Sequence, residues 1–362
     1  MIPRSRSRSR IHRVAAASLA AAVVSSIALA GCGDDDGPVT VRLVTYDSFP
    51  TEGTSLNEAL AEFTAETGIT VELAVAGDAG TMVSKAVLTA GNPEGDVMWG
   101  IDNTLLSRAL SADVFEPYAS TQLDALDPEL TALVPGNEVT PVDSGEVCLN
   151  YDIAWFADRG LEPPATFSDL IDPAYRDLLV VQNPASSSPG LAFLLATIAE
   201  LGADGWQEYW AALRANGVEV VDSWTTAYDE RFSGSGGGDR PLVVSYATSP
   251  PAEVIFADPP RDDAPTATIV DTCFQQVEFA GVLRGTEHPD EARRLIDFLA
   301  GSTFQSEVAL NLFVYPARTD VELPEEFIRF SGEVTDPRTL PPEDIAAGQQ
   351  AWIDEWTEIV LR

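Results

Sequence analysis

Strand-like and helix-like stretches alternate three times between residues 39 and 110, and this pattern constrains the fold of the 362-residue chain most. Strands separated by helices in this way form a parallel sheet with helices on both faces, which is a three-layer α/β lobe. The expected strands are residues 39–45, 69–76 and 96–99, and the expected helices begin at a Ser55/Glu58 capping box and end at Gly68, cover residues 81–90, and end at Leu110.

Polar and aromatic residues follow the first and the third of these strands. Tyr46 and Asp47 come directly after the first strand, and Asp102 and Asn103 come shortly after the third. In open α/β sheets, ligands bind beyond the carboxyl ends of the strands. The sequence therefore predicts that these four residues lie at one edge of the sheet, near a ligand.

A second set of strands and helices follows, and the chain then returns to the first set. Strands are expected at residues 146–151, 178–182, 218–221 and 242–245, and later at 268–270 and 274–282. We predict two three-layer α/β/α lobes joined by a two-crossing hinge, with the ligand in the cleft between them. Lobe 1 is residues 39–137 and 275–362, and lobe 2 is residues 138–274. Such a hinged clamp closes on a ligand, which favours a binding function over catalysis.

The amino terminus has the pattern of an export signal. Several arginines precede an apolar stretch at residues 14–30, which ends in Leu-Ala-Gly-Cys at Cys32. The last four residues resemble the bacterial lipobox, although an ordinary signal peptide with a chance cysteine is the alternative. We expect residues 1–31 to be removed, Cys32 to be lipidated, and residues 32–38 to form a flexible tether at the outer face of the cytoplasmic membrane.

The charge of the chain limits the classes of partner. With 21 basic and 57 acidic residues, the net charge is −36, which disfavours nucleic acid or anionic lipid as the main partner. A cationic ligand is compatible with this charge, and so is simple solubility. The two histidines and three cysteines form no cluster with metal-ligand spacing, so neither a metal site nor a cofactor is expected. Cys148 and Cys273 are either a disulfide or two separate buried thiols.

Aromatic residues gather at the ends of two later strands. Trp224 and Tyr228 lie four residues apart in the segment DSWTTAYDERF, and Tyr246 lies in the segment SYATSP. They suit a pocket for a flat, cationic ligand, although Trp224 would also suit a core. Ser187, Ser188 and Gly190 precede an apolar helix, where free backbone N–H groups bind anions. The alternative for these serines is an ordinary N-cap.

Seven segments, taken in order, resemble one family. They are TYDSF at 45–49, GIDNTLL at 100–106, NPASSSPGLAFLL at 183–195, DSWTTAYDERF at 222–232, VVSYATSP at 243–250, QVEFAG at 276–281 and AWIDEW at 351–356. Together they resemble the thiamine-binding proteins of bacterial ABC importers, which have the type II periplasmic-binding-protein fold. The resemblance covers nearly all of the chain after the export signal.

The resemblance implies a role for each candidate residue. Trp224, Tyr228 and Tyr246 match the positions that stack on thiamine in the family. By the same match, Ser187, Ser188 and Gly190 meet the hydroxyl or phosphate end of the ligand, and Tyr46, Asp47, Asp102 and Asn103 hold its pyrimidine. Phe313 stands where the family pattern has a Trp, which bears on fine specificity and on preference for phosphate esters. The implied partners are thiamine or thiamine phosphate and an importer permease.

Other functions remain as alternatives. A binding protein of the same fold for ferric iron, a polyamine or a phosphonate is the nearest one. Ferric sites typically use adjacent tyrosines, and the sequence has no Tyr-Tyr pair. A lipid-anchored hydrolase needs a nucleophile and a base, and no Gly-x-Ser-x-Gly motif is present. We expect a monomeric binding protein and not an enzyme.

Overall fold

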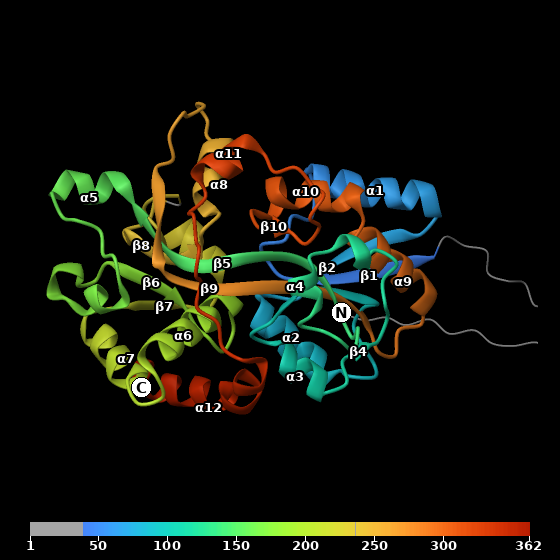
Figure 1. Ribbon diagram of the computed structural model, residues 1–362, viewed down its shortest axis with the longest axis horizontal. Helices are drawn as coiled ribbons and strands as arrows, with labels where there is room; N and C mark the ends of the chain where they lie inside the picture. Colours follow the sequence, from blue (N-terminus) through green and yellow to red (C-terminus); the bar gives the residue numbers. More distant parts are fainter. Residues whose placement is uncertain (1–38, 236) are drawn as a thin grey trace, which may run out of the picture. The chain divides into compact units, whose positions relative to one another are not determined.

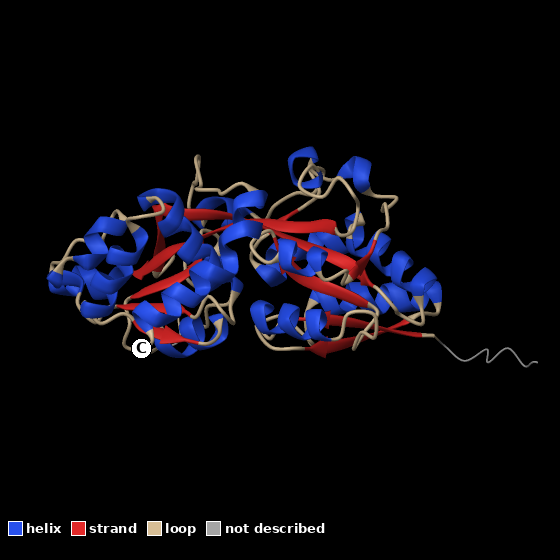
Figure 2. Ribbon diagram, turned by 90° about the horizontal axis from the view of Figure 1, so that it is seen from below, coloured by secondary structure: helices blue, strands red, loops and turns tan. Residues whose placement is uncertain are grey.

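The computed structural model describes residues 39–235 and 237–362. The predicted signal peptide, the tether and Cys32 lie outside the described residues. Eight strands form one continuous sheet, in the order β2 (Thr70–Val75), β1 (Thr40–Thr45), β3 (Val97–Asp102), β9 (Thr266–Leu283), β5 (Thr140–Asp152), β8 (Leu242–Tyr246), β6 (Leu179–Gln182) and β7 (Glu219–Val221). The short strands β10 (Tyr315–Pro316) and β4 (Phe115–Glu116) pair with β5 and β9. Helices flank the strands (Figure 2). The parallel arrangement expected for the first three strands is present in β1, β2 and β3, whereas β5 and β9 run antiparallel to their neighbours, so the whole sheet is mixed.

One end of the sheet contains the three strand–helix pairs that the sequence predicts. β1 lies between β2 and β3 and is parallel to both. The elements are β1 (Thr40–Thr45), α1 (Ser55–Thr67), β2 (Thr70–Val75), α2 (Ala79–Leu88), β3 (Val97–Asp102), α3 (Leu106–Ser111), β4 (Phe115–Glu116), η1 (Leu123–Ala125) and α4 (Pro128–Thr131).

The capping box of α1 lies one residue earlier than the sequence suggested. Thr54 is the N-cap: its backbone is extended, and its side chain accepts a hydrogen bond from the backbone N–H of Asn57. The Asn57 side chain in turn accepts from the backbone N–H of Thr54, at 3.1 Å. The predicted Ser55/Glu58 box is therefore wrong, because an Asn in the third helical position takes the role usually filled by Glu or Gln.

Two long antiparallel strands connect the two ends of the sheet (Figure 1). They are β5 (Thr140–Asp152), of which only residues 146–151 were expected as a strand, and β9 (Thr266–Leu283), which was expected as two short strands. Their pairing is interrupted by register shifts between Pro141 and Asp143 and between Val147 and Leu149. β9 pairs with β3 at one end and β5 pairs with β8 at the other. Both strands therefore belong to both ends of the sheet.

The other end of the sheet carries the aromatic segment. It comprises α5 (Ile153–Arg159), η2 (Phe167–Ile171), η3 (Pro173–Tyr175), β6 (Leu179–Gln182), α6 (Ser188–Leu201), α7 (Trp206–Ala215), β7 (Glu219–Val221), the π-helical segment η4 (Thr226–Arg231), β8 (Leu242–Tyr246) and α8 (Ser249–Ile255). β6 is parallel to β7 and to β8.

The carboxy-terminal part covers both ends of the sheet. It consists of α9 (Pro289–Leu299), α10 (Ser302–Leu312), β10 (Tyr315–Pro316), α11 (Glu325–Phe330) and α12 (Pro342–Val360), of which α10 and α11 were missed in the sequence. In α12, Trp356 packs on Trp210 of α7, with ring centroids 5.4 Å apart. The Gln349 side chain donates to the carbonyl of Thr104, just before α3. The last helix therefore contacts elements on both sides.

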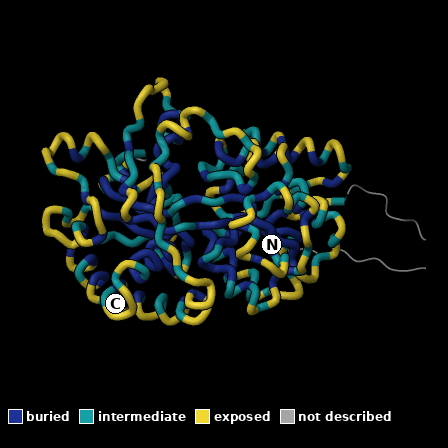
Figure 3. Tube along the Cα trace, viewed as in Figure 1, coloured by how far each residue is buried: buried dark blue, intermediate teal, exposed yellow. Residues whose placement is uncertain are grey.

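The core follows the sheet, whose strands are mostly buried (Figure 3). Cys148 of β5 and Cys273 of β9 are fully buried and are joined in a disulfide beside the second register shift. Within residues 39–235 and 237–362, no helix combines the length and the apolar character needed to cross a membrane.

Candidate functional site

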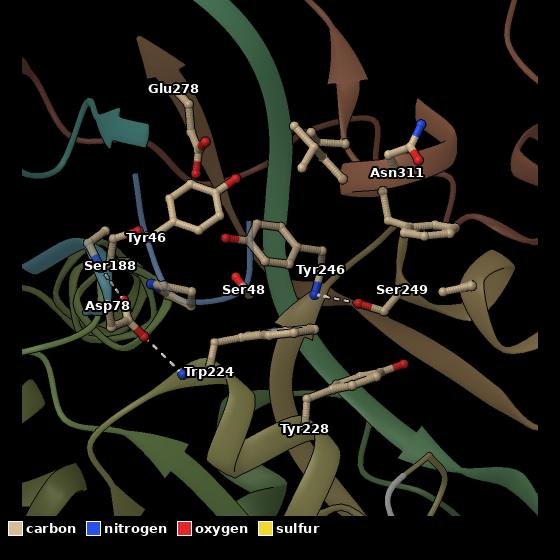
Figure 4. A pocket seen from close by; sticks show the side chains of 16 residues that line it. Tyr46, Ser48, Asp78, Ser188, Trp224, Tyr228, Tyr246, Ser249, Glu278 and Asn311 are labelled. Carbon is tan, nitrogen blue, oxygen red and sulfur yellow. Dashed lines mark hydrogen bonds between the residues drawn. The ribbon is translucent and has the colours of Figure 1, made fainter. Parts of the chain in front are cut away.

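A cavity of about 790 Å³, counting the part open to solvent, lies beside the ends of β1 and β8. Aromatic, hydroxyl and carboxyl groups face it from both ends of the sheet (Figure 4). Its lining consists of Tyr46, Ser48, Asp78, Ala79, Ser188, Pro189, Trp224, Tyr228, Tyr246, Ser249, Ala252, Glu278, Asn311, Leu312, Phe313 and Val314.

Two stacked rings form one wall of the cavity. Trp224 and Tyr228 have ring centroids 4.9 Å apart and planes inclined by only 11° (Figure 4). The Trp224 indole N–H donates to Ser245 Oγ at 2.9 Å, and the Tyr228 hydroxyl donates to Glu253 at 3.0 Å. Both rings are therefore fixed in orientation before any ligand arrives, which lowers the entropic cost of stacking on them.

Tyr246 is positioned by the turn from β8 into α8. Its backbone N–H donates to Ser249 Oγ at 3.1 Å, and Ser249 Oγ lies 2.7 Å from Ser245 Oγ. Ser245 also receives the Trp224 indole, so one hydroxyl pair orients two aromatic residues of the cavity. Ser245 and Ser249 therefore orient the aromatic residues of the cavity.

Tyr46 depends on a glycine in the neighbouring strand. Gly100 has a φ of 96°, and a Cβ there would lie 2.3 Å from the Tyr46 ring. Only glycine accepts both the positive φ and this close approach. The glycine of GIDNTLL therefore makes room for an aromatic residue of the cavity.

Asp78 links the two ends of the sheet across the cavity. As the N-cap of α2 it accepts the Ala79 N–H at 2.6 Å, and it also accepts the backbone N–H of Trp224 at 2.9 Å. Beside it, the Thr81 N–H donates to the carbonyl of Ser186 at 3.1 Å. Burial raises the pKa of Asp78 to about 6, against the lowering effect of the Trp224 N–H. Asp78 is therefore a direct support of Trp224, which the sequence did not reveal.

Six of the predicted site residues line the cavity together: Tyr46, Ser188, Trp224, Tyr228, Tyr246 and Phe313. Phe313 is held by its backbone, which has a φ of 54° after the last turn of α10. Its ring packs against Phe256 with centroids 5.4 Å apart. The Ser188 hydroxyl accepts a hydrogen bond from Gln276 at 2.7 Å.

The other five predicted residues do not line the cavity. Asp102 is fully buried and accepts hydrogen bonds from Thr104, Leu105 and Gln276, so it fixes the turn between β3 and α3. Asn103 bonds to the β9 backbone, through Gln275 and Val277.

Asp47, Ser187 and Gly190 complete this group. Asp47 is exposed in the turn after β1. Ser187 is fully buried, as the N-cap of α6. A Cβ on Gly190 would lie 2.5 Å from the carbonyl oxygen of Gln182, so this glycine lets α6 approach β6. Gly190, Asp102 and Asn103 therefore have structural roles that tie the elements around the cavity together.

Five polar lining residues were not among the predicted site residues: Ser48, Asp78, Ser249, Glu278 and Asn311. Glu278 belongs to the segment QVEFAG, one of the seven segments that carry the family resemblance, in which no ligand contact was predicted. Asp78 follows β2 directly, so its position at the carboxyl end of a strand was the available signal. Asn311 lies in a helix that the sequence analysis missed, and it had no such signal.

The raised carboxyl pKa values predict that stability falls as the pH rises. Burial raises the pKa of Asp78 to about 6 and that of Glu146 to about 7, so the native state binds these protons more tightly than the unfolded chain. The unfolding free energy is therefore expected to decrease between about pH 4 and pH 7, by up to about 3 kcal/mol from Asp78. Urea unfolding at several pH values in this range measures the change in unfolding free energy.

Asp78→Asn provides the matched variant, because the amide does not ionise; its single oxygen accepts from either the Trp224 N–H or the Ala79 N–H, where the carboxylate accepts from both. Repulsion among the surface acids is common to both proteins, so the difference between them isolates Asp78. The variant is expected to lose less stability than the wild type between pH 5 and pH 7.5. Identical pH profiles for the two proteins would show that Asp78 does not titrate in this way.

The family of the protein follows from comparison with known sequences. The sequence model described as "Bacterial extracellular solute-binding protein" matches residues 95–328, more than half of the chain. This chain belongs to the bacterial extracellular solute-binding proteins. As a member of this family, it is an extracytoplasmic solute-binding protein.

Individual members of the family give a finer comparison. The chain is 27% identical to the thiamine-binding periplasmic proteins of Escherichia coli and of Salmonella typhimurium, over 89% of its length and 94% of theirs. A solved periplasmic thiamin binding protein matches with a TM-score of 0.77 and 26% identity, over 89% of this chain and 96% of that one. The ferric binding protein of Campylobacter jejuni matches with a TM-score of 0.68 and 15% identity, over 88% and 99%, which shows a shared fold alone. The predicted α/β fold of a type II periplasmic binding protein is confirmed.

Proposed function

We propose that this solute-binding protein captures thiamine in the cavity and delivers it to the permease of an ABC importer. The observation that carries the proposal is the aromatic wall of Trp224 and Tyr228, with Tyr246 nearby, in a cavity that also has Asp78 and Glu278 in its lining. Thiamine combines a cationic thiazolium ring with a flat aminopyrimidine. Cations gain roughly 0.5–2 kcal/mol over a Trp or Tyr face, and the carboxyl groups complement the positive charge.

The charge of the lining favours free thiamine over thiamine diphosphate. No lysine, arginine or histidine is among the described residues that line the cavity. The anion-binding feature at hand is the start of α6 at Ser188, where free backbone N–H groups attract negative charge, although Pro189 has no N–H to contribute. We propose that this helix start receives the hydroxyethyl arm or a single phosphate. The two phosphates of the diphosphate would lie close to carboxyl groups.

The lobe division predicted from the sequence fits this proposal. We propose that the two ends of the sheet act as lobes, which close on thiamine by bending at β5 and β9, near the register shifts of these strands. The Asp78–Trp224 hydrogen bond would then hold the lobes together in the closed form. We further propose a monomer anchored by a lipid on Cys32 to the outer face of the cytoplasmic membrane, next to the permease.

A panel of ligands in thermal unfolding tests the proposal. Ligand at 100 times its dissociation constant stabilises the native state by about 2.7 kcal/mol, so thiamine is expected to raise the melting temperature by several degrees. Thiamine monophosphate is expected to give a similar or smaller shift, and thiamine diphosphate a clearly smaller one. Putrescine and ferric citrate serve as controls for the other ligand classes. A shift with either control and none with thiamine would overturn the proposal.

A further inference from the structure

Three carboxyl groups lie in one row across neighbouring strands beside the cavity. Asp102 of β3 is directly opposite Glu278 of β9, and Glu278 is directly opposite Asp143 of β5. Side chains at directly opposite positions of antiparallel strands lie on the same face, with Cβ atoms about 4.5–5.5 Å apart. All three are buried, and Glu278 lines the cavity (Figure 4).

Asp102 differs from the other two acids in its hydrogen-bond partners. The oxygens of Asp102 are used by Thr104, Leu105 and Gln276. Both oxygens of Asp143 and the Oε2 atom of Glu278 are buried and accept no hydrogen bond from any described residue. Glu278 is only 5% exposed. Apart from a proton held between the two acids and the Tyr46 hydroxyl beside Glu278, the described chain supplies no partner, and a buried carboxylate with so few partners is costly. This pair is therefore poised for a cation.

No positive charge of the described chain offsets these acids. None of the ion pairs among residues 39–235 and 237–362 involves them. The titratable groups that face Glu278 are all acids or phenols: Asp102 from β3, Asp143 from β5, Tyr46 after β1, and Tyr246 from β8.

The environment of the pair favours a bound proton when no ligand is present. Burial, followed by the charges of Asp143 and Asp102, raises the pKa of Glu278 well above its usual range. Burial likewise raises the pKa of Asp143. Two carboxyl groups this close share one proton more readily than they hold two negative charges.

We propose that Glu278 binds the positive charge of the ligand, and that the Glu278–Asp143 pair releases its shared proton when the ligand enters. The inference rests on the proposed function and adds to it the group that selects for a cation. One O–H bond of the pair breaks, the proton passes to solvent, and the ligand cation takes over its charge, so the charge of the site is conserved. The ligand itself is not altered. Affinity therefore rises with pH while the pair titrates, because the complex holds fewer protons than the free protein.

Calorimetry in two buffers measures the number of protons that the protein releases when thiamine binds. Thiamine is titrated into the mature protein at one pH in phosphate and in Tris, whose ionisation enthalpies differ, and the difference in binding enthalpy gives the protons released. The wild type is expected to release protons. Glu278→Gln is expected to bind thiamine roughly tenfold or more weakly and to release none, because a charged acceptor is lost. Asp143→Asn is expected to keep its affinity within a few-fold and to release none.

Glu146→Gln is the matched control, since Glu146 is a part-buried acid of the same strand as Asp143 and does not line the cavity. It is expected to match the wild type in affinity and in proton release. Glu278→Gln with wild-type affinity, beside a wild type that binds thiamine, overturns this inference and leaves the proposed function intact. A wild type that does not bind thiamine overturns both. If Glu278→Gln does not fold by circular dichroism, the wild type decides, because binding without proton release contradicts the proposal.

Discussion

Trp224→Ala is expected to weaken thiamine binding by roughly 10- to 100-fold, because the cation loses its main aromatic face and the buried stacking area. The change also removes the indole bond to Ser245 and the ring that covers Tyr228. The dissociation constant from calorimetric titration measures the effect. Circular dichroism and the melting temperature establish that the variant is folded.

Two further variants separate stacking from other effects. Trp224→Phe keeps an aromatic face and loses the N–H donor, so it is expected to retain more affinity than alanine. Trp155→Ala removes a Trp that lies outside the cavity lining, under Arg159 at 4.0 Å, and is expected to leave binding unchanged. If Trp224→Ala binds thiamine as tightly as the wild type, the indole belongs to the core and not to the ligand.

Replacing both disulfide cysteines with serine is expected to lower the unfolding free energy by about 2–5 kcal/mol. The bond between Cys148 and Cys273 closes a loop of 125 residues, so its loss frees a large part of the unfolded chain. Both residues are fully buried, and the serine hydroxyls add a further cost there. Urea unfolding of the double variant and of the wild type measures the difference.

The oxidised wild type is the reference for this comparison. Denatured, unreduced protein is expected to contain no free thiol at Cys148 or Cys273, and the reduced wild type is expected to unfold at a lower urea concentration. Two free thiols in the denatured protein, or coincident unfolding curves, would contradict the account. Because neither cysteine lines the cavity, the folded double variant is expected to bind thiamine with wild-type affinity.

The sequence predicted local elements well and long strands poorly. The helix periodicity of α1, α7 and α9 depends on neighbouring residues alone, so it is visible in a single chain. β9 was divided into two short strands because residues around Asp271 are polar, yet pairing with β5 keeps it continuous over Thr266–Leu283. Strand length depends on distant partners, which periodicity does not report.

For the candidate site too, local features were visible in the sequence and contacts between distant residues were not. Trp224, Tyr228 and Tyr246 were identified because aromatic residues at strand ends stand out in a sequence. Asp102 was expected at the ligand, because its place at the end of a strand suits a ligand contact as well as a helix cap. Only the positions of Thr104 and Gln276 show that its oxygens are already used. The sequence did not single out Glu278, because nothing in one strand shows that Asp143 lies opposite.

The most direct test of the central claim is the stoichiometry and affinity of thiamine for the mature wild-type protein by isothermal titration calorimetry. The account predicts one site per chain, saturable binding of thiamine, and strong loss of this binding in Trp224→Ala. No measurable heat with thiamine in either phosphate or Tris, together with saturable binding of ferric citrate or putrescine, would contradict it.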